Sequence, residues 1–181
     1  SELLASCGDD FTLFLWNPTK TKKPITRMTG HQQPVNYVAF SPDGRTIASA
    51  SFDNSVRLWN GISGKFIKTL RGHVQSVYQL AWSADSRLLC SSSQDSTLKV
   101  WEMRTHKMKI ELPGHADEVY AVDWSPDGKK VVSGGKDCVL KIKNRFISIE
   151  IDGKYIGALP EDLSFRLTKL IKSGNEYQCI I

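Results

Sequence analysis

The chain has 181 residues, of which 40% are hydrophobic and 24% are charged, a composition that excludes disordered and fibrous proteins. It contains no run of about 18 apolar residues, so no membrane-spanning helix is expected. Asp9 and Asp10 stand where a signal peptide would need its apolar core, so secretion is not expected. The four cysteines lie far apart without a CxxC pair, which favours free thiols in a reducing compartment over a zinc site or disulfides. The net charge of +5 favours anionic partners but identifies none.

The sequence repeats itself with a period of about 42 residues. Gly-His pairs end at His31, His73 and His115, and tryptophans recur with the same period at Trp16, Trp59 and Trp101. Each of these tryptophans stands six residues after an aspartate, and a fourth aspartate continues the series without one; the aspartates are Asp10, Asp53, Asp95 and Asp137. Three residue types in phase over several periods predict a repeat architecture, in which neighbouring units bury each other's apolar faces.

Each period predicts four short β-strands. In one of them, apolar segments at 66–70, 77–82, 88–92 and 97–101 are separated by Gly72-His73, by the Ser83 to Ser86 turn and by the turn that begins at Asp95. Equivalent turns occur at Ser41-Pro-Asp-Gly44 and Ser125-Pro-Asp-Gly128. Such short strands cannot bury their faces alone, but they can when their sheets stack radially as blades.

The last 39 residues, 143–181, break the pattern. Lys143 stands six residues after Asp137, where the repeat places tryptophan. Alternating isoleucines at 147–151 predict a strand and Asp152-Gly153 a hairpin turn. Pro160, acidic residues in the first turn, an apolar stripe over 163–171 and Gly174 predict a helix, and a strand follows at 177–181. We therefore predict a small β-β-α-β tail, of a kind that the repeats do not explain.

The period, the Gly-His pairs and the dipeptides Trp16-Asn17, Trp59-Asn60 and Trp101-Glu102 resemble the WD40 repeat, although the terminal aspartate is never present. The fold class expected is all-β: a portion of a WD40 β-propeller with about three and a half blades and a small α+β C-terminal tail. The repeat region is 1–142, with a partial blade at 1–17 and repeats at about 24–60, 65–102 and 107–142. Propellers have four or more blades, so such a chain is expected to form an open arc with unpaired strand edges.

Longer strings in 1–142, such as LRGHVQSVYQLAWSADSRLL and LPGHADEVYAVDWSPDG, resemble the closing blades of the Notchless family. These WD-repeat factors assemble the large ribosomal subunit, and they carry an amino-terminal ubiquitin-like domain that engages the AAA ATPase midasin, followed by an eight-bladed propeller. The chain is expected to start inside a blade, without the ubiquitin-like segment. The resemblance implies a nuclear or nucleolar protein that binds pre-60S components, with no cofactor, small-molecule substrate or membrane.

The resemblance also implies a buried hydrogen-bond relay in each blade, in which aspartate accepts from histidine, histidine meets a serine hydroxyl and an indole N–H ends the series. The residues at these positions are His31, Ser49, Asp53 and Trp59; His73, Ser91, Asp95 and Trp101; and His115, Ser133 and Asp137, with Lys143 in place of the last tryptophan.

Other chemical interpretations of these residues explain less. Ser, His and Asp can form a nucleophilic triad, but a catalytic site is built once rather than three times. The histidines belong to different blades and lack metal-ligand spacing, so no metal is expected, and there is no phosphate-binding loop. Basic pairs such as Lys22-Lys23 and Lys129-Lys130 leave direct rRNA binding open as an alternative, although no RNA-binding motif supports it.

The resemblance implies a partner-binding narrow face at positions one, three and five after each Gly-His histidine and one before each turn aspartate. Aromatic side chains on this face favour a protein interface over a solvated surface, although the rings can instead pack against neighbouring blades. The function expected is a non-enzymatic protein-interaction scaffold in pre-60S assembly, with a direct rRNA-binding module and a generic signalling adaptor as alternatives. The residues of the expected face are Pro34, Asn36, Phe52, Ser76, Tyr78, Gln94, Glu118, Tyr120 and Lys136.

Overall fold

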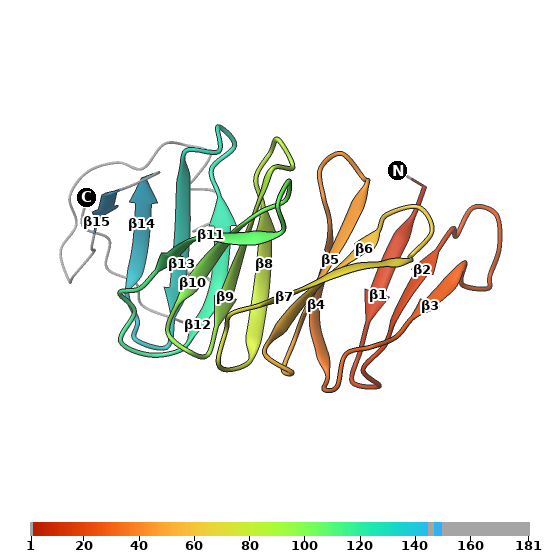
Figure 1. The fold of residues 1–181 in the computed structure, drawn as a ribbon, viewed down its shortest axis with the longest axis horizontal. Coiled ribbons are helices and arrows are strands. Elements are labelled where there is room, and N and C mark those ends of the chain that lie inside the picture. The colour runs from red at the N-terminus through yellow and green to blue at the C-terminus, as the bar shows by residue number, and fades with distance from the viewer. Residues whose placement is uncertain (1, 145–146, 150–181) are drawn as a thin grey trace.

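The computed structural model describes residues 2–144 and 147–149, and these residues form antiparallel β-sheets without a helix (Figure 1). The all-β prediction is therefore confirmed for the described part of the chain. The first sheet has three strands in the order β1-β2-β3. Their bounds are Leu4–Cys7 for β1, Leu13–Trp16 for β2 and Thr26–Met28 for β3.

Three further sheets have four strands each, and in each the spatial order follows the chain order. The second sheet contains β4 (Val35–Phe40), β5 (Thr46–Ser51), β6 (Ser55–Asn60) and β7 (Phe66–Arg71). The third contains β8 (Val77–Trp82), β9 (Leu88–Ser93), β10 (Leu98–Glu102) and β11 (Lys107–Leu112). The fourth contains β12 (Val119–Trp124), β13 (Lys130–Gly135), β14 (Leu140–Asn144) and β15 (Ile147–Ile149).

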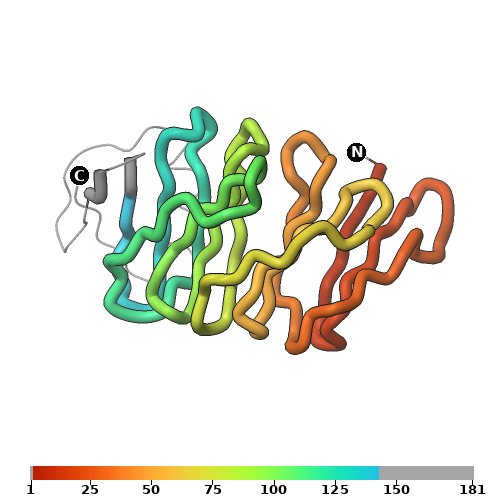
Figure 2. The backbone as a smooth tube through the Cα atoms, in the orientation of Figure 1, coloured from red at the N-terminus to blue at the C-terminus, as the bar shows by residue number. Residues whose placement is uncertain are grey.

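The sheets stand side by side in a row, with the first and the fourth at opposite ends (Figures 1 and 2). Their innermost strands β1, β4, β8 and β12 are neighbours in that order. This arrangement is an arc of blades, as the open-arc prediction describes for these residues.

The sheets are out of phase with the sequence periods by one strand. The segment 66–70, which opens a sequence period, forms β7 and pairs with β6 of the preceding sheet, with Leu70 opposite Val56. β11 pairs with β10 in the same way, and β3 with β2. Each period of the sequence therefore supplies the outer strand of one sheet and the three inner strands of the next.

Burial follows the position of a strand within its sheet. The second strands β5, β9 and β13 are buried over five of their six residues. β5 and β9 belong to sheets that have a neighbouring sheet on each side. The outer strands β7 and β11 are mostly exposed. Apolar clusters fill the spaces between sheets, and Trp59 and Trp101 are each only 2% exposed within them. The core is thus a series of inter-blade layers, which suits a repeat protein.

The fourth sheet is complete at the level of its backbone. β14 pairs with β13, and Lys143 stands opposite Val131, the register that Trp101 has opposite Leu89. β15 covers the outer edge of β14, with Ile149 opposite Ile142. The strand predicted at 147–151 is confirmed over Ile147–Ile149. The helix expected at 160–174 and the strand at 177–181 lie outside the described residues.

Candidate functional site

The second sheet holds a continuous series of hydrogen bonds that joins its inner strands. The indole Nε1 of Trp59 donates to Ser49 Oγ at 2.9 Å, and Ser49 Oγ lies 2.8 Å from His31 Nε2. His31 Nδ1 lies 2.7 Å from Asp53 Oδ2. With an ionised aspartate as the final acceptor, every group has one role: tryptophan donates to serine, serine to histidine and histidine to aspartate.

The third sheet repeats the same geometry 42 residues later. Trp101 Nε1 donates to Ser91 Oγ at 2.9 Å, His73 Nε2 lies 2.8 Å from that oxygen, and His73 Nδ1 lies 2.8 Å from Asp95 Oδ2. Thr97 donates its hydroxyl to Asp95 Oδ1 at 2.7 Å. The histidine and aspartate side chains are 1% and 5% exposed. The four groups therefore satisfy one another where water does not reach them.

The aspartates of the second and third sheets have lowered pKa values. Burial alone would raise the pKa of Asp53, but hydrogen bonds from His31 and Ser55 outweigh it and hold that pKa well below its usual range. Burial opposes ionisation of Asp95 too, and hydrogen bonds from His73 and Thr97 again lower its pKa. Both carboxylates are therefore charged acceptors at neutral pH.

The fourth sheet carries a shorter series. His115 Nε2 lies 2.8 Å from Ser133 Oγ, and its Nδ1 lies 2.9 Å from Asp137 Oδ2. Lys143 takes the backbone position of the tryptophan. Val139 stands where the other sheets have Ser55 and Thr97, so Asp137 accepts the backbone N–H of Val139, at 3.2 Å, without the neighbouring hydroxyl bond. Among the described residues, the fourth sheet therefore lacks an indole donor to its serine and a hydroxyl donor to its aspartate, two bonds that the second and third sheets share.

Sequence reasoning missed several members of these series. In the first sheet, Trp16 Nε1 donates to Ser6 Oγ at 2.9 Å, and Ser6 precedes Trp16 by the ten residues that separate Ser49 from Trp59. Cations recur two residues before the tryptophan positions and lie beside the Gly-His pairs: Lys99 pairs with Glu111 at 2.7 Å, and Lys141 Nζ donates to the Gly114 carbonyl. The equivalent in the second sheet is Arg57. The 42-residue spacing was the signal that could have found them.

The Ser-His-Asp geometry is unsuited to attack on a substrate. Ser49 and Ser91 have no exposed surface, and the indole N–H of a tryptophan points at each hydroxyl oxygen. A nucleophilic serine has to approach a substrate carbonyl, which these hydroxyls cannot do. The chemistry that the arrangement supports is cross-linking of strands, not turnover.

The residues of the expected narrow face gather at the end of the sheets where the Gly-His segments and the aspartate turns lie. In each sheet the same backbone bond joins two of them: Phe52 N–H donates to the Pro34 carbonyl at 3.1 Å, and the pairs Gln94 with Ser76 and Lys136 with Glu118 repeat it at 2.9 Å. Asn36 crosses to the next sheet and donates to the Tyr78 carbonyl at 2.6 Å. All nine residues thus occupy equivalent places in three adjacent sheets.

Three aromatic rings form a row across this face, one from each of three sheets. Phe52 meets Tyr78 edge-on with ring centroids 6.0 Å apart, and Tyr78 meets Tyr120 at 5.3 Å. Phe52 is 36% exposed and Tyr120 is 47% exposed, while Tyr78 between them is half-buried. The rings therefore pack between blades, and the outer two also present apolar surface to solvent. We call Phe52, Tyr78 and Tyr120 the aromatic row.

Charged groups border the aromatic row on one side. The Tyr78 hydroxyl donates to Glu118 Oε2 at 2.8 Å, and burial together with this carboxylate raises the pKa of Tyr78 to about 12. Lys136 Nζ lies 3.4 Å from Asp117 and 3.8 Å from Glu118. These contacts fix the orientation of the central ring, so the row is organised before any partner arrives.

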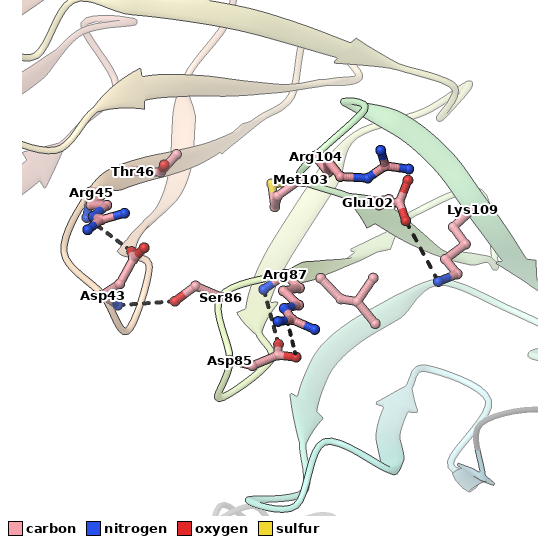
Figure 3. A pocket seen from close by; sticks show the side chains of 11 residues that line it. Asp43, Arg45, Thr46, Asp85, Ser86, Arg87, Glu102, Met103, Arg104 and Lys109 are labelled. Atoms are coloured by element: carbon pink, nitrogen blue, oxygen red, sulfur yellow. Dashed lines mark hydrogen bonds and ion pairs between the residues drawn. The ribbon is translucent and has the colours of Figure 1, made fainter.

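An open cavity of about 670 Å³ lies at the opposite end of the sheets, between the second and the third (Figure 3). The turns around Asp43 and Asp85 and the β10–β11 hairpin line it, and Asp43 N–H donates to Ser86 Oγ at 3.1 Å to join the two turns. Arg45, Arg87 and Arg104 belong to the lining. This cavity is charged rather than apolar, unlike an ordinary small-molecule pocket.

Within the described residues, no group of three histidine, cysteine or acidic side chains could hold a metal ion. No helix long and apolar enough to cross a membrane occurs in that part of the chain either.

Antiparallel sheets in a row, with a histidine, serine, aspartate and tryptophan series repeated in the second and third of them, define the WD40 class of β-propeller. A family model described as the fourth β-propeller of WDR90 matches residues 34–153, about two thirds of the chain, and the chain belongs to this WD40 β-propeller family.

Individual relatives match over a shorter stretch. Ribosome assembly protein 4 of Saccharomyces cerevisiae is 66% identical over 68 residues, which cover 38% of this chain and 13% of that protein. The Notchless protein homolog of Arabidopsis thaliana is 70% identical over 66 residues, 36% of this chain and 14% of that protein. Ribosome assembly protein 4 of Chaetomium thermophilum is 62% identical over 69 residues, 38% of this chain and 13% of that protein. The predicted resemblance to Notchless repeats is confirmed, and the matches span 13% to 14% of the length of these relatives.

Proposed function

We propose that this chain is a non-enzymatic scaffold that binds protein components of the large ribosomal subunit during its assembly in the nucleus and nucleolus. The aromatic row is the observation that carries the proposal, because exposed aromatic rings on a rigid surface are the anchors that protein interfaces use most. The names of the relatives, ribosome assembly protein 4 and Notchless, support the process.

The chemistry around the row indicates the kind of partner segment. The connections at this end of the sheets, outside the strands, carry seven acidic side chains and one basic side chain in residues 8–139. A partner with an apolar or aromatic side chain beside lysine or arginine would fill the space along the row and meet Asp117 and Glu118. The relay has a separate role in this proposal: it holds the strands in place so that the row keeps its geometry.

Co-sedimentation with purified pre-60S particles tests this function. Phe52→Gln together with Tyr120→Gln should release the chain from the particles, because both exposed rings are lost while the buried relay is untouched. Ile62→Gln together with Met108→Gln is the matched control, since these apolar side chains are 71% and 46% exposed and lie outside the row. If the wild-type chain does not sediment with the particles, the process is wrong. If both double variants sediment as the wild type does, the row is not the interface.

The direct rRNA-binding alternative has support from a different surface, at the other end of the sheets. The aromatic row does not favour it, because the connections at the row's own end of the sheets have a net negative charge.

A further inference from the structure

The charges of the molecule are separated between the two ends of its sheets. We define the basic end by the connections between β2 and β3, β4 and β5, β6 and β7, β8 and β9, β10 and β11, and β12 and β13, which lie along the upper edge in Figure 1. These connections contain eight lysines and arginines and three aspartates, a net charge of +5. The connections at the opposite end have a net charge of −6. The chain therefore has a strong charge asymmetry that its overall charge of +5 does not reveal.

The basic end presents cations at regular positions. Arg45, Arg87 and Lys129 each follow an aspartate turn, 42 residues apart, and all three are exposed. Their backbone N–H groups donate to Asp43, Asp85 and Asp127 at 3.1, 3.0 and 3.0 Å. Since the three turns have the same backbone bonds, the three residues occupy equivalent positions in their sheets. They form a row across adjacent sheets.

The aspartates of these turns accept hydrogen bonds from other residues of the same turn. Asp43 Oδ1 accepts the Ser41 hydroxyl at 2.5 Å, and Asp127 accepts the Ser125 hydroxyl at 2.5 Å in the same manner. The pairing between Arg87 and Asp85 is weak, because the two atoms are 4.0 Å apart and the arginine side chain is 84% exposed. The cations are therefore free to meet an external anion in place of water.

The neighbouring hairpins add to this row. The β2–β3 connection carries Lys20, Lys22 and Lys23, and the β10–β11 connection carries Arg104, which lines the cavity between the second and third sheets. The six connections contain no phenylalanine, tyrosine or tryptophan. A surface with many dispersed cations and no aromatic ring lacks the stacking platforms that single-stranded nucleic-acid binders use.

We propose that the basic end binds the phosphate backbone of structured RNA, with Arg45, Arg87 and Lys129 as its central contacts. Phosphates repeat along a nucleic-acid strand, so a row of cations on successive blades can meet several of them at once. Without aromatic platforms, the surface reads shape and charge rather than base sequence. The acidic opposite end orients the molecule, because it repels the same polyanion. This surface is separate from the aromatic row, so this inference and the proposed function can fail independently.

Fluorescence anisotropy with a labelled RNA hairpin tests the proposal on the whole chain. The variant Arg45→Gln, Arg87→Gln, Lys129→Gln should bind at least about tenfold more weakly at low salt, and the slope of log K against log salt should fall by about 2 to 3, close to one for each lost phosphate contact. The control is Arg27→Gln, Lys68→Gln, Arg71→Gln, which removes the same charge from exposed positions elsewhere. It should keep most of the affinity and the slope.

Three results would overturn the proposal: no salt-dependent binding by the wild-type chain, an equal loss in both triple variants, or displacement of the RNA by poly-glutamate as effective as that by unlabelled RNA of equal charge. The last result would assign the surface to an acidic protein. Both variants should fold as the wild type does, since none of the six substituted side chains is buried. Far-UV circular dichroism checks that their secondary structure is unchanged.

Discussion

Substitution of Asp95 by alanine should strongly destabilise the third sheet. The carboxylate accepts four hydrogen bonds, from His73 Nδ1 at 2.8 Å, Val74 N–H at 3.1 Å, Thr97 N–H at 3.1 Å and the Thr97 hydroxyl at 2.7 Å. Val74 is exposed, so water can replace its bond, whereas the His73 side chain is only 1% exposed. An unsatisfied buried donor costs roughly 1–3 kcal/mol, and the turn bonds from Thr97 add roughly 1 kcal/mol. We expect Asp95→Ala to lower the free energy of unfolding by about 2–4 kcal/mol.

Urea denaturation followed by far-UV circular dichroism measures this loss. Asp9→Ala, at an exposed position, is the control for the removal of one negative charge and should change the midpoint little. Asp137→Ala should cost less than Asp95→Ala, because Asp137 lacks the bond from a hydroxyl two residues later. An Asp95→Ala midpoint equal to that of the wild type would refute the role that we give to the relay.

Three further results are expected. Trp101→Phe should destabilise the chain by about 1–2 kcal/mol in urea denaturation, since it removes the donor to Ser91 Oγ and part of a buried ring; an unchanged midpoint would show that the indole N–H contributes nothing. Folding lowers the pKa values of Asp53 and Asp95, so their contribution to stability is present above about pH 4 and is lost as the pH falls further. The double variant Asp53→Asn, Asp95→Asn should therefore show a smaller fall in the urea midpoint between about pH 5 and pH 2 than the wild type. Parallel profiles for variant and wild type would contradict this. Lys143→Trp should slow amide hydrogen exchange in β13 and β14, since residue 143 has the register of Trp101 and its indole can donate to Ser133; unchanged or faster exchange would argue against an equivalent site.

The sequence was sufficient to predict features that depend on local pattern. The segment 77–82 alternates and is bounded by turn residues, and it forms β8 with the expected bounds. The residues of the relay could be named because each belongs to a repeated position. The family resemblance implies the register of the strands within one sheet. This register brings His31, Ser49 and Asp53 together.

Other features depend on how sheets pack against each other, which the sequence does not state. The contact of Tyr78 with both Phe52 and Tyr120 requires three adjacent sheets at a particular spacing. The charge separation appears only when the connections are sorted by the end of the sheet to which they belong. The offset between sequence periods and sheets also had to come from the pairing of β6 with β7.

The one-strand offset determines where the chain can be cut. A chain that ended at Glu102, after the tryptophan that closes a sequence period, would keep β10 but lose β11, and the third sheet would expose a long unpaired edge. A cut between Leu112 and Val119 would leave that sheet complete. Protease sites, domain insertions and exchanges of blades between relatives should accordingly be tolerated best immediately before each Gly-His pair, and worst at the boundaries that the sequence repeat suggests.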